Sequence, residues 1–129
     1  MTDPIADLLT RIKNAYLAKH QSLIVPRSRL KEEVVKILIK HHYLANVKVE
    51  GKKPFLNLKI DLKYVNRQPV ITNVRRISRP GVRHYADVAK LNSLIKGRGM
   101  TLLSTSRGIM TVAEARKLKV GGEIICKIN

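Results

Sequence analysis

The chain has 129 residues, of which 44% are hydrophobic, and 26 Lys and Arg against nine Asp and Glu give it a net charge of +17. This length fits one compact unit or two small domains, and with no Trp and a single Phe the core is predicted to be aliphatic. No apolar stretch approaches the roughly 18 residues of a membrane span, the N-terminus lacks a secretory pattern, and the single Cys126 can form no internal disulfide, so we expect a soluble, cytoplasmic protein with no membrane partner.

The first helix is expected at residues 4–19, where Asp3-Pro4 is typical of an N-cap followed by proline and apolar residues recur at helical spacing. A short strand at residues 23–25 precedes a second helix, which Ser28 caps and which ends near Tyr43. The buried side of this second helix is predicted to consist of Leu30, Val34, Ile37, Leu38 and His41.

Two strands complete the predicted first half. Residues 44–50 are expected to form the first strand, and Gly51-Lys52-Lys53-Pro54 the turn after it. From residue 56 to residue 64 apolar and polar residues alternate, which predicts an antiparallel strand with one buried face. Residues 1–65 are therefore predicted to form an N-terminal α/β lobe of order α-β-α-β-β.

The second half is predicted to be rich in strands. Asn66-Arg67-Gln68-Pro69 marks the expected boundary, and Arg79-Pro80-Gly81 an expected turn. A capping box from Thr111 to Glu114 predicts one short helix that ends near Leu118. The expected strands cover residues 70–77, 101–104, 108–110 and 123–128. Residues 66–129 are thus predicted to form a β-rich lobe, and the fold class of the chain is predicted to be α+β.

The positive charge indicates a polyanionic partner. Residues 1–65 carry +7 and residues 66–129 carry +10, and Arg outnumbers Lys only in the second half. Because an Arg guanidinium pairs bidentately with phosphate and stacks on bases, we place the closer nucleic-acid contact in residues 66–129. The alternative is an ordinary basic surface that serves only solubility.

Three consecutive hydroxyl side chains, Ser104, Thr105 and Ser106, separate two apolar strand pieces and are followed by Arg107. Hydroxyls both donate and accept hydrogen bonds, so such a loop can contact phosphate oxygens and ribose 2′-hydroxyls in the shallow minor groove of RNA. Composition alone favours an ordinary Ser/Thr turn.

A second candidate surface surrounds the predicted turn at residues 79–81. Its members are Arg75, Arg76, Arg79, Arg83, His84 and Tyr85. Arginines beside an aromatic ring suit phosphate neutralisation combined with base or ribose stacking. The alternative is a solvated basic hairpin whose Tyr85 packs against the core.

No catalytic or metal site can be assembled from the sequence. A serine of the hydroxyl segment could be grouped with His84 and Asp87, but the nucleophile elbow is absent. Lys96-Gly97-Arg98-Gly99 is too short for a phosphate-binding loop. The four His residues lack ligand spacing, and Cys126 is expected to be a small buried hydrophobe in the last strand. We therefore expect no enzymatic activity, no metal and no cofactor.

Three segments together resemble the eighth small-subunit ribosomal protein family. They occur in the same order as in that family, and the resemblance covers essentially the whole chain. They are Thr2-Asp3-Pro4-Ile5-Ala6-Asp7-Leu8-Leu9-Thr10-Arg11-Ile12, Ile77-Ser78-Arg79-Pro80-Gly81-Val82-Arg83, and Leu103-Ser104-Thr105-Ser106-Arg107-Gly108-Ile109-Met110-Thr111 with Glu114-Ala115-Arg116 and Val120-Gly121-Gly122-Glu123. The chain departs from the family at Arg107, where Lys is common, and at Lys127-Ile128-Asn129, where an aromatic is frequent.

The resemblance implies a primary RNA-binding protein of the small ribosomal subunit. Members of this family bind the central domain of small-subunit ribosomal RNA early in assembly and support the platform region with neighbouring ribosomal proteins. Some bacterial members also repress their own operon by binding its messenger RNA. The sequence leaves open whether the ribosome is bacterial or organellar.

The resemblance also implies two lobes, with the main RNA surface on the C-terminal one. It places Tyr85, Gly122 and Glu123 beside the hydroxyl loop, and Glu123 is expected either to orient a neighbouring Arg or to accept a hydrogen bond from RNA. The match of residues 26–31 implies a second RNA contact on the N-terminal lobe. With the arginines above, the expected RNA-binding residues are Ser104, Thr105, Ser106, Arg107, Arg79, Arg83, Tyr85, Gly122, Glu123, Arg27, Arg29 and Lys31.

Two other function classes share the charge. A DNA-binding or chromatin-like protein would need a base-reading helix, but Glu32 and Glu33 interrupt the first turn of the helix that follows Ser28. An enzyme that acts on RNA would need an acid/base pair or a metal site, which this sequence does not offer.

Overall fold

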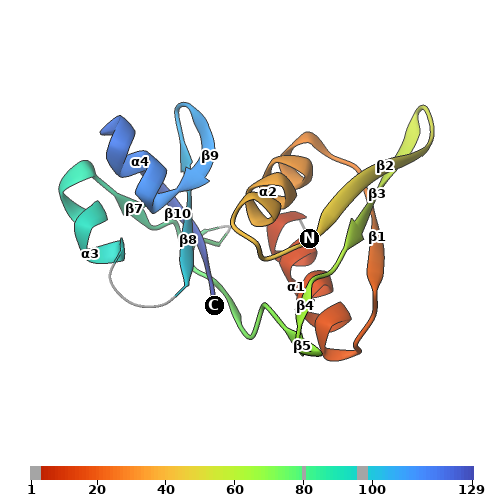
Figure 1. Ribbon diagram of the computed structural model, residues 1–129. Coiled ribbons are helices and arrows are strands. Elements are labelled where there is room, and N and C mark those ends of the chain that lie inside the picture. The colour runs from red at the N-terminus through yellow and green to blue at the C-terminus, as the bar shows by residue number, and fades with distance from the viewer. Residues whose placement is uncertain (1–3, 80, 96–98) are drawn as a thin grey trace. The chain divides into compact units, whose positions relative to one another are not determined.

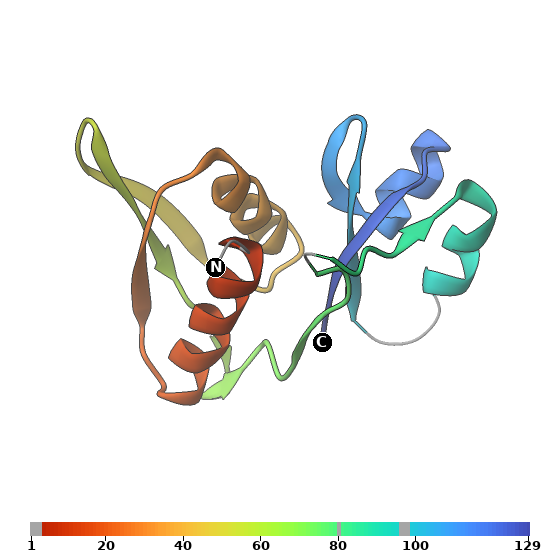
Figure 2. The same ribbon diagram turned by 180° about the vertical axis from the view of Figure 1, so that it is seen from behind.

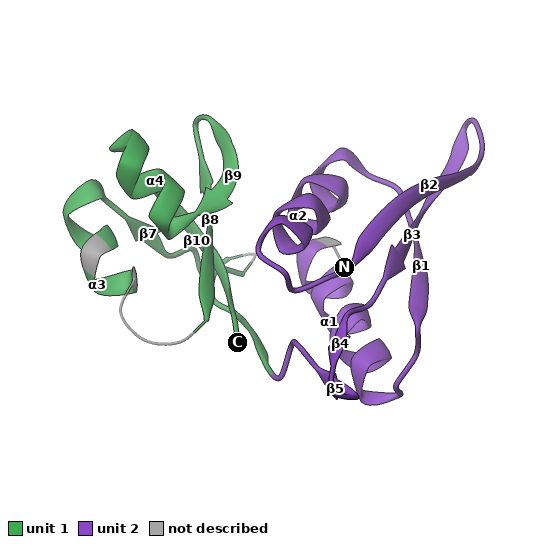
Figure 3. Ribbon diagram, viewed as in Figure 1, with its two compact units in different colours: residues 1–3, 73–129 green, residues 4–72 purple. Residues whose placement is uncertain are grey.

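The computed structural model describes residues 4–79, 81–95 and 99–129 (Figure 1). The chain divides into two compact units, Pro4–Thr72 and Asn73–Asn129 (Figure 3). Both units combine helices with antiparallel strands, so the predicted α+β class is confirmed. The predicted cap at Asp3, Pro80 of the predicted turn, and residues 96–98 of the glycine-containing stretch lie outside the described residues.

The first unit follows the predicted order α-β-α-β-β and adds a small hairpin. Its elements are α1 (Pro4–Leu17), β1 (Ser22–Pro26), α2 (Arg29–Lys40), β2 (Asn46–Lys52), β3 (Phe55–Asp61), β4 (Tyr64–Val65) and β5 (Gln68–Pro69). β3 lies between β1 and β2 in an antiparallel sheet, and α1 and α2 lie on one side of this sheet, as Figure 2 shows from behind.

The segment expected to mark the lobe boundary contains a turn within the first unit. Asn66 and Arg67 both have positive φ (52° and 64°) and join β4 to β5 as a two-residue hairpin turn. The division between the compact units follows Thr72. The assignment of lobes 1–65 and 66–129 to separate functions stays a prediction.

Apolar and polar residues alternate along β3, so the apolar side chains lie on one face of the first sheet, which packs against the helices. Leu58 and Ile60 are fully buried, while Lys59 between them is partly exposed, as the sequence pattern predicts. The helices contribute Leu8, Ile12, Val34 and Leu38 to this core, and Val25 and Leu44 of the same unit are also fully buried.

The helix α2 begins as predicted and ends earlier. The Ser28 side chain accepts a hydrogen bond from the backbone N–H of Lys31 at 3.2 Å, so the predicted N-cap is confirmed. The helix ends at Lys40, not near Tyr43.

The buried stripe of α2 differs from the predicted one. It consists of Val34, Val35 and Leu38, whereas Leu30 is 37% exposed. The prediction was therefore wrong at Leu30. Apolar residues lie around much of this helix, so their periodicity does not decide which of two adjacent stripes faces the sheet.

The second unit is built around the last strand. Its elements are β6 (Val74–Arg76), β7 (Tyr85–Ala86), the 3-10 helix η1 (Val88–Lys90), α3 (Leu91–Ile95), β8 (Met100–Thr105), β9 (Gly108–Thr111), α4 (Val112–Leu118) and β10 (Gly122–Ile128). β10 pairs with β6 and β7 on one side and with β8 on the other, and β9 extends the sheet beyond β8. The strand predicted over residues 70–77 shortens to β6, and η1 and α3 were not predicted because such short segments carry little apolar periodicity.

The predicted helix start and the predicted buried cysteine are both confirmed in the second unit. The Thr111 hydroxyl accepts from the N–H of Glu114 at 3.2 Å and lies 3.3 Å from its carboxylate. Cys126 is fully buried in β10, and burial raises the pKa of its thiol to about 12. The helix α4 contributes Val112 and Ala115 to a core that also contains Ala86, Leu91, Leu103, Met110 and Ile124.

Candidate nucleic-acid interface

The run of three hydroxyl residues belongs to a tight β-hairpin. Ser104 and Thr105 end β8, Gly108 begins β9, and Thr105 and Gly108 are opposite each other in the register. Only Ser106 and Arg107 form the turn, and the positive φ of Gly108 (105°) is one that glycine adopts without strain. The hairpin presents Ser104, Ser106 and Arg107 as exposed residues.

The three hydroxyls have different surroundings. The Thr105 hydroxyl donates to the carbonyl of Gly108 at 2.9 Å and accepts from the N–H of Arg107 at 3.1 Å, so it stabilises the turn. Within the described part of the chain, the hydroxyls of Ser104 and Ser106 form no hydrogen bond. These two hydroxyls are therefore available to a ligand.

A row of polar residues crosses three strands beside this hairpin. Glu123 of β10 is opposite Ser104 of β8 on one side and Tyr85 of β7 on the other. Directly opposed residues of antiparallel strands place their side chains on the same face of a sheet. Tyr85 is 67% exposed, so its ring does not pack into the core and is open to stacking.

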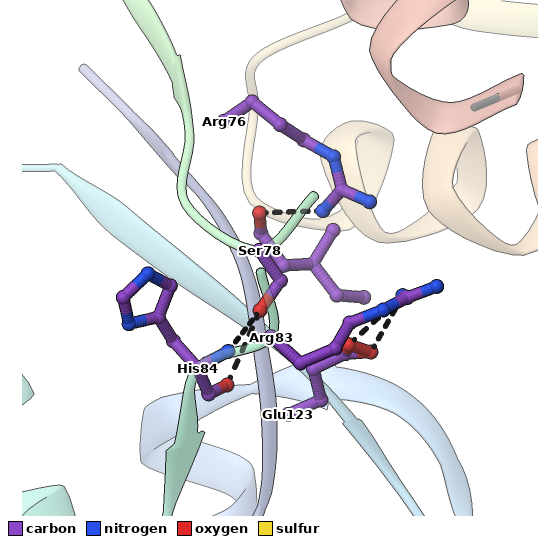
Figure 4. A network of polar contacts seen from close by, with 6 residues as sticks. Arg76, Ser78, Arg83, His84 and Glu123 are labelled. Carbon is purple, nitrogen blue, oxygen red and sulfur yellow. Dashed lines mark hydrogen bonds and ion pairs between the residues drawn. The ribbon is translucent and has the colours of Figure 1, made fainter. Parts of the chain in front are cut away.

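The acidic member of this row is paired. Arg83 Nη1 lies 3.1 Å from one carboxylate oxygen of Glu123 and 3.3 Å from the other, and the two side chains are 47% and 18% exposed (Figure 4). The guanidinium neutralises the carboxylate and fixes its orientation. Of the two expected roles for Glu123, a contact with a neighbouring Arg is present in the structure.

A buried serine closes the loop that carries the arginines. Ser78 Oγ accepts from the N–H of His84 at 2.9 Å and donates to the carbonyl of His84 at 3.2 Å (Figure 4). Inside the loop the N–H groups of Arg79 and Val82 each donate to the other's carbonyl, at 2.9 and 3.0 Å. The loop is therefore fixed at its base, and Arg79 and Arg83 are exposed on it.

Two further features of this surface were not recognised from the sequence. Arg76 turns back onto the sheet and its Nη1 donates to the carbonyl of Ile125 at 2.6 Å. A Cβ atom at Gly122 would collide with the backbone carbonyl of Ser104, so glycine lets β10 and β8 approach here. Neither role has a local signal, because each depends on a partner distant in sequence.

The candidate residues of the first unit surround the N-terminus of α2. Arg27 lies 3.2 Å from Glu32, and Arg29 lies 3.8 Å from Glu33. The side chain of Arg29 remains 94% exposed and Lys31 is partly exposed. The two acidic residues therefore lower the net positive charge of this stretch.

The described residues offer no group of three or more His, Cys, Asp or Glu side chains that could hold a metal ion. Among the helices of the described ranges, none is long and apolar enough to span a membrane.

Sequence comparison relates the whole chain to one family. The profile of the family described as "Ribosomal protein S8" matches residues 3–129. The chain is 44% identical to the small ribosomal subunit protein uS8 of Dictyoglomus turgidum, 46% identical to that of Flavobacterium johnsoniae and 45% identical to that of Hydrogenovibrio crunogenus. The alignments cover 98–99% of this chain and 98% of each of these relatives.

Proposed function

The chain belongs to the ribosomal protein S8 family, and from this premise we propose that it is a primary RNA-binding protein of the small ribosomal subunit. The proteins of this family are structural and not enzymes, which agrees with the expectation from the sequence. The proposed ligand is the central domain of small-subunit ribosomal RNA, and the proposed setting is the cytoplasmic ribosome. The proposed protein partners are its neighbours in the platform region of that subunit.

The observation that carries this proposal is the row of Tyr85, Glu123 and Ser104 beside the hairpin turn, in which Tyr85 and Ser104 are exposed and Glu123 is partly exposed. It combines an exposed aromatic ring, a carboxylate acceptor held by Arg83 and the hydroxyl of Ser104 on one face of the sheet. These groups suit ribose and base edges in the shallow minor groove of RNA, whereas Arg79 and Arg107 suit the flanking phosphates. The second-half charge of +10 supplies the long-range attraction.

The N-terminal lobe is proposed to touch a second RNA segment through Arg27, Arg29 and Lys31. The support is the exposure of Arg29 and Lys31 next to a helix N-terminus, where backbone N–H groups and the helix dipole favour phosphate. The ion pairs with Glu32 and Glu33 make this surface less basic, so we expect it to add less affinity than the second unit.

The proposed mechanism needs only binding energy. The protein stabilises the RNA conformation that it binds, by the difference between its affinity for that conformation and for competing ones. It is therefore needed in stoichiometric amounts. In a reconstitution of small subunits at graded protein ratios, assembly rescued at one protein per hundred RNA molecules would contradict a structural role.

Footprinting of the purified chain on small-subunit ribosomal RNA tests the proposed site directly. We expect one protected local helix in the central domain, with affinity that falls steeply as salt rises because phosphate contacts release counterions. Duplex DNA of equal length is the control ligand. Equal affinity for both, or a log-log salt slope near zero, would argue against specific RNA binding.

Repression of the protein's own operon belongs to the same proposal. A messenger RNA fold similar to the ribosomal site would use the same surface, so the two RNAs should compete. A shared site would be contradicted if an excess of the ribosomal RNA fragment failed to displace the operon messenger RNA from the protein.

A further inference from the structure

The proposed RNA surface has a carboxylate, that of Glu123, at its centre. Glu123 carries negative charge where RNA brings more, and an unpaired carboxylate there would repel the ligand. The chain instead pairs it with Arg83, whose Nη1 lies within 3.3 Å of both carboxylate oxygens (Figure 4). With its side chain 18% exposed, the carboxylate is held at the surface and still open to solvent.

The neighbours of Glu123 restrict what it can bind. Ser104 and Tyr85 flank it across the sheet, so a nucleotide stacked on the Tyr85 ring would bring its polar edge near the carboxylate. An ionised carboxylate only accepts hydrogen bonds. Its partners on RNA are therefore neutral donors, the exocyclic amino group of a base or the ribose 2′-hydroxyl, and not phosphate.

The loop that carries Arg83 is built to hold it in this place. Ser78 is fully buried and forms two hydrogen bonds to the backbone of His84, the residue after Arg83. His84 in turn accepts a hydrogen bond at its carbonyl from the N–H of Ile124, next to Glu123, at 2.8 Å. The backbones of the two paired residues are thus tied together.

We infer that Arg83 is a positioning residue, which holds the Glu123 carboxylate between Tyr85 and Ser104 as the acceptor for a neutral donor group of the RNA. This inference rests on the proposed function. It assigns to Glu123 the selection of a particular nucleotide and to Arg83 an action through Glu123. A direct phosphate contact by Arg83 is the competing assignment, and the two differ in measurable ways.

The test uses the full chain and the fragment of small-subunit ribosomal RNA that the wild type protects in footprinting. The variants are Glu123→Gln, Arg83→Gln, Arg83→Lys and the double Glu123→Gln/Arg83→Gln. Matched controls are Asp7→Asn and Arg11→Gln, which remove the same charges from the exposed ion pair of α1, whose atoms lie 3.1 Å apart.

Glu123→Gln should weaken binding up to roughly tenfold, because a neutral amide oxygen replaces the charged acceptor, accepts a weaker hydrogen bond and loses its ion pair with Arg83. Charge alone predicts the opposite, since the variant removes a negative charge from an RNA surface. Arg83→Gln should weaken binding similarly with an unchanged salt slope, whereas loss of a phosphate contact lowers that slope by about one. The double variant should bind about as weakly as Glu123→Gln and show no additive loss, because both changes weaken the same contact.

Modified RNA identifies the donor. One series replaces single riboses by deoxyribose, and the other deletes single exocyclic amino groups, with inosine for guanosine and purine riboside for adenosine. At one position the modification should weaken binding to the wild type clearly more than it weakens binding to Glu123→Gln, whose neutral amide oxygen accepts only a weaker hydrogen bond. If that position is found in the deoxyribose series, the donor is a ribose 2′-hydroxyl. If it is found in the series without amino groups, the donor is a base amino group.

Tighter binding by Glu123→Gln, or additive losses with a reduced salt slope in Arg83→Gln, would overturn the inference. The inference would also be overturned if every modified position in both series affected the wild type and Glu123→Gln equally. Arg83→Lys keeps the charge and serves as the conservative variant, and partial recovery of affinity relative to Arg83→Gln is expected. A wild-type chain that protects no ribosomal RNA refutes the proposed function itself, so the two failures are distinct.

Discussion

The Thr105 hydroxyl donates a hydrogen bond to the carbonyl of Gly108, 2.9 Å away across the turn between β8 and β9. The same oxygen accepts from the N–H of Arg107. The middle residue of the hydroxyl run is thus part of the hairpin, whereas the hydroxyls of Ser104 and Ser106 are available to a ligand. Three residues of similar chemistry should therefore separate into a structural member and two binding members.

Thr105→Val should lower the free energy of unfolding by about 1 kcal/mol, the usual net contribution of an intramolecular hydrogen bond. Urea unfolding followed by circular dichroism measures this change. Thr105→Ser retains the hydroxyl and should remain close to the wild type. A valine variant as stable as the wild type would show that the turn does not depend on this hydroxyl.

The double change Ser104→Ala/Ser106→Ala should weaken RNA binding by about 1–3 kcal/mol if each hydroxyl donates or accepts one bond. The thermal midpoint should stay unchanged, since neither hydroxyl has a partner within the described part of the chain. Filter binding to the protected fragment measures the effect, with Thr10→Ala, exposed on α1, as the control. Unchanged affinity at an unchanged midpoint would remove these serines from the site.

Charge reversal at Arg79 should reduce RNA affinity more than reversal at Lys59. Arg79 is exposed on the loop that Ser78 closes, whereas Lys59 lies on the exposed face of the first sheet. Arg79→Glu and Lys59→Glu change the net charge equally, so any difference in affinity reflects position. The reverse order in filter binding would move the main RNA surface to the first unit.

Gly122→Ala should destabilise the second unit by roughly 1–3 kcal/mol, the usual cost of forcing an extra methyl into a packed site. The added Cβ would collide with the carbonyl of Ser104, and β10 and β8 would have to separate. Loss of RNA affinity should accompany the loss of stability because Ser104 and Glu123 would shift. Thermal unfolding measures the first effect, and a midpoint equal to that of the wild type would refute the close approach.

The Cys126 thiol should react with a disulfide reagent at pH 8 only as fast as the second unit opens. Burial raises the pKa of this thiol to about 12, so the native state holds almost no thiolate at that pH. Between the ordinary thiol pKa of 9.0 and about 12 the unfolded state loses a proton that the folded state keeps. Stability should therefore fall as pH rises through that range. Immediate labelling of the folded protein would contradict this burial.

Local patterns in the sequence were sufficient for most of the elements. The alternation in residues 56–64 predicted the strand β3, which ends earlier, at Asp61. Ser28 predicted the start of α2, and the Thr111 capping box predicted the start of α4. Each of these signals lies within a few residues, and its physical cause acts over the same range. The prediction that Leu30 is buried was wrong because packing against the sheet, and not local periodicity, selects the buried face of α2.

The sequence by itself determined the α+β class, the net charge of +17 and the family to which the chain belongs. Only the tertiary structure decided that Arg83 is the arginine that pairs with Glu123, 40 residues away, and that Glu123 is directly opposite both Ser104 and Tyr85 in the strand register. The register of antiparallel strands sets these contacts, and register depends on turns and packing throughout the sheet. No short segment contains that information, so the surface exists only once the strands have paired.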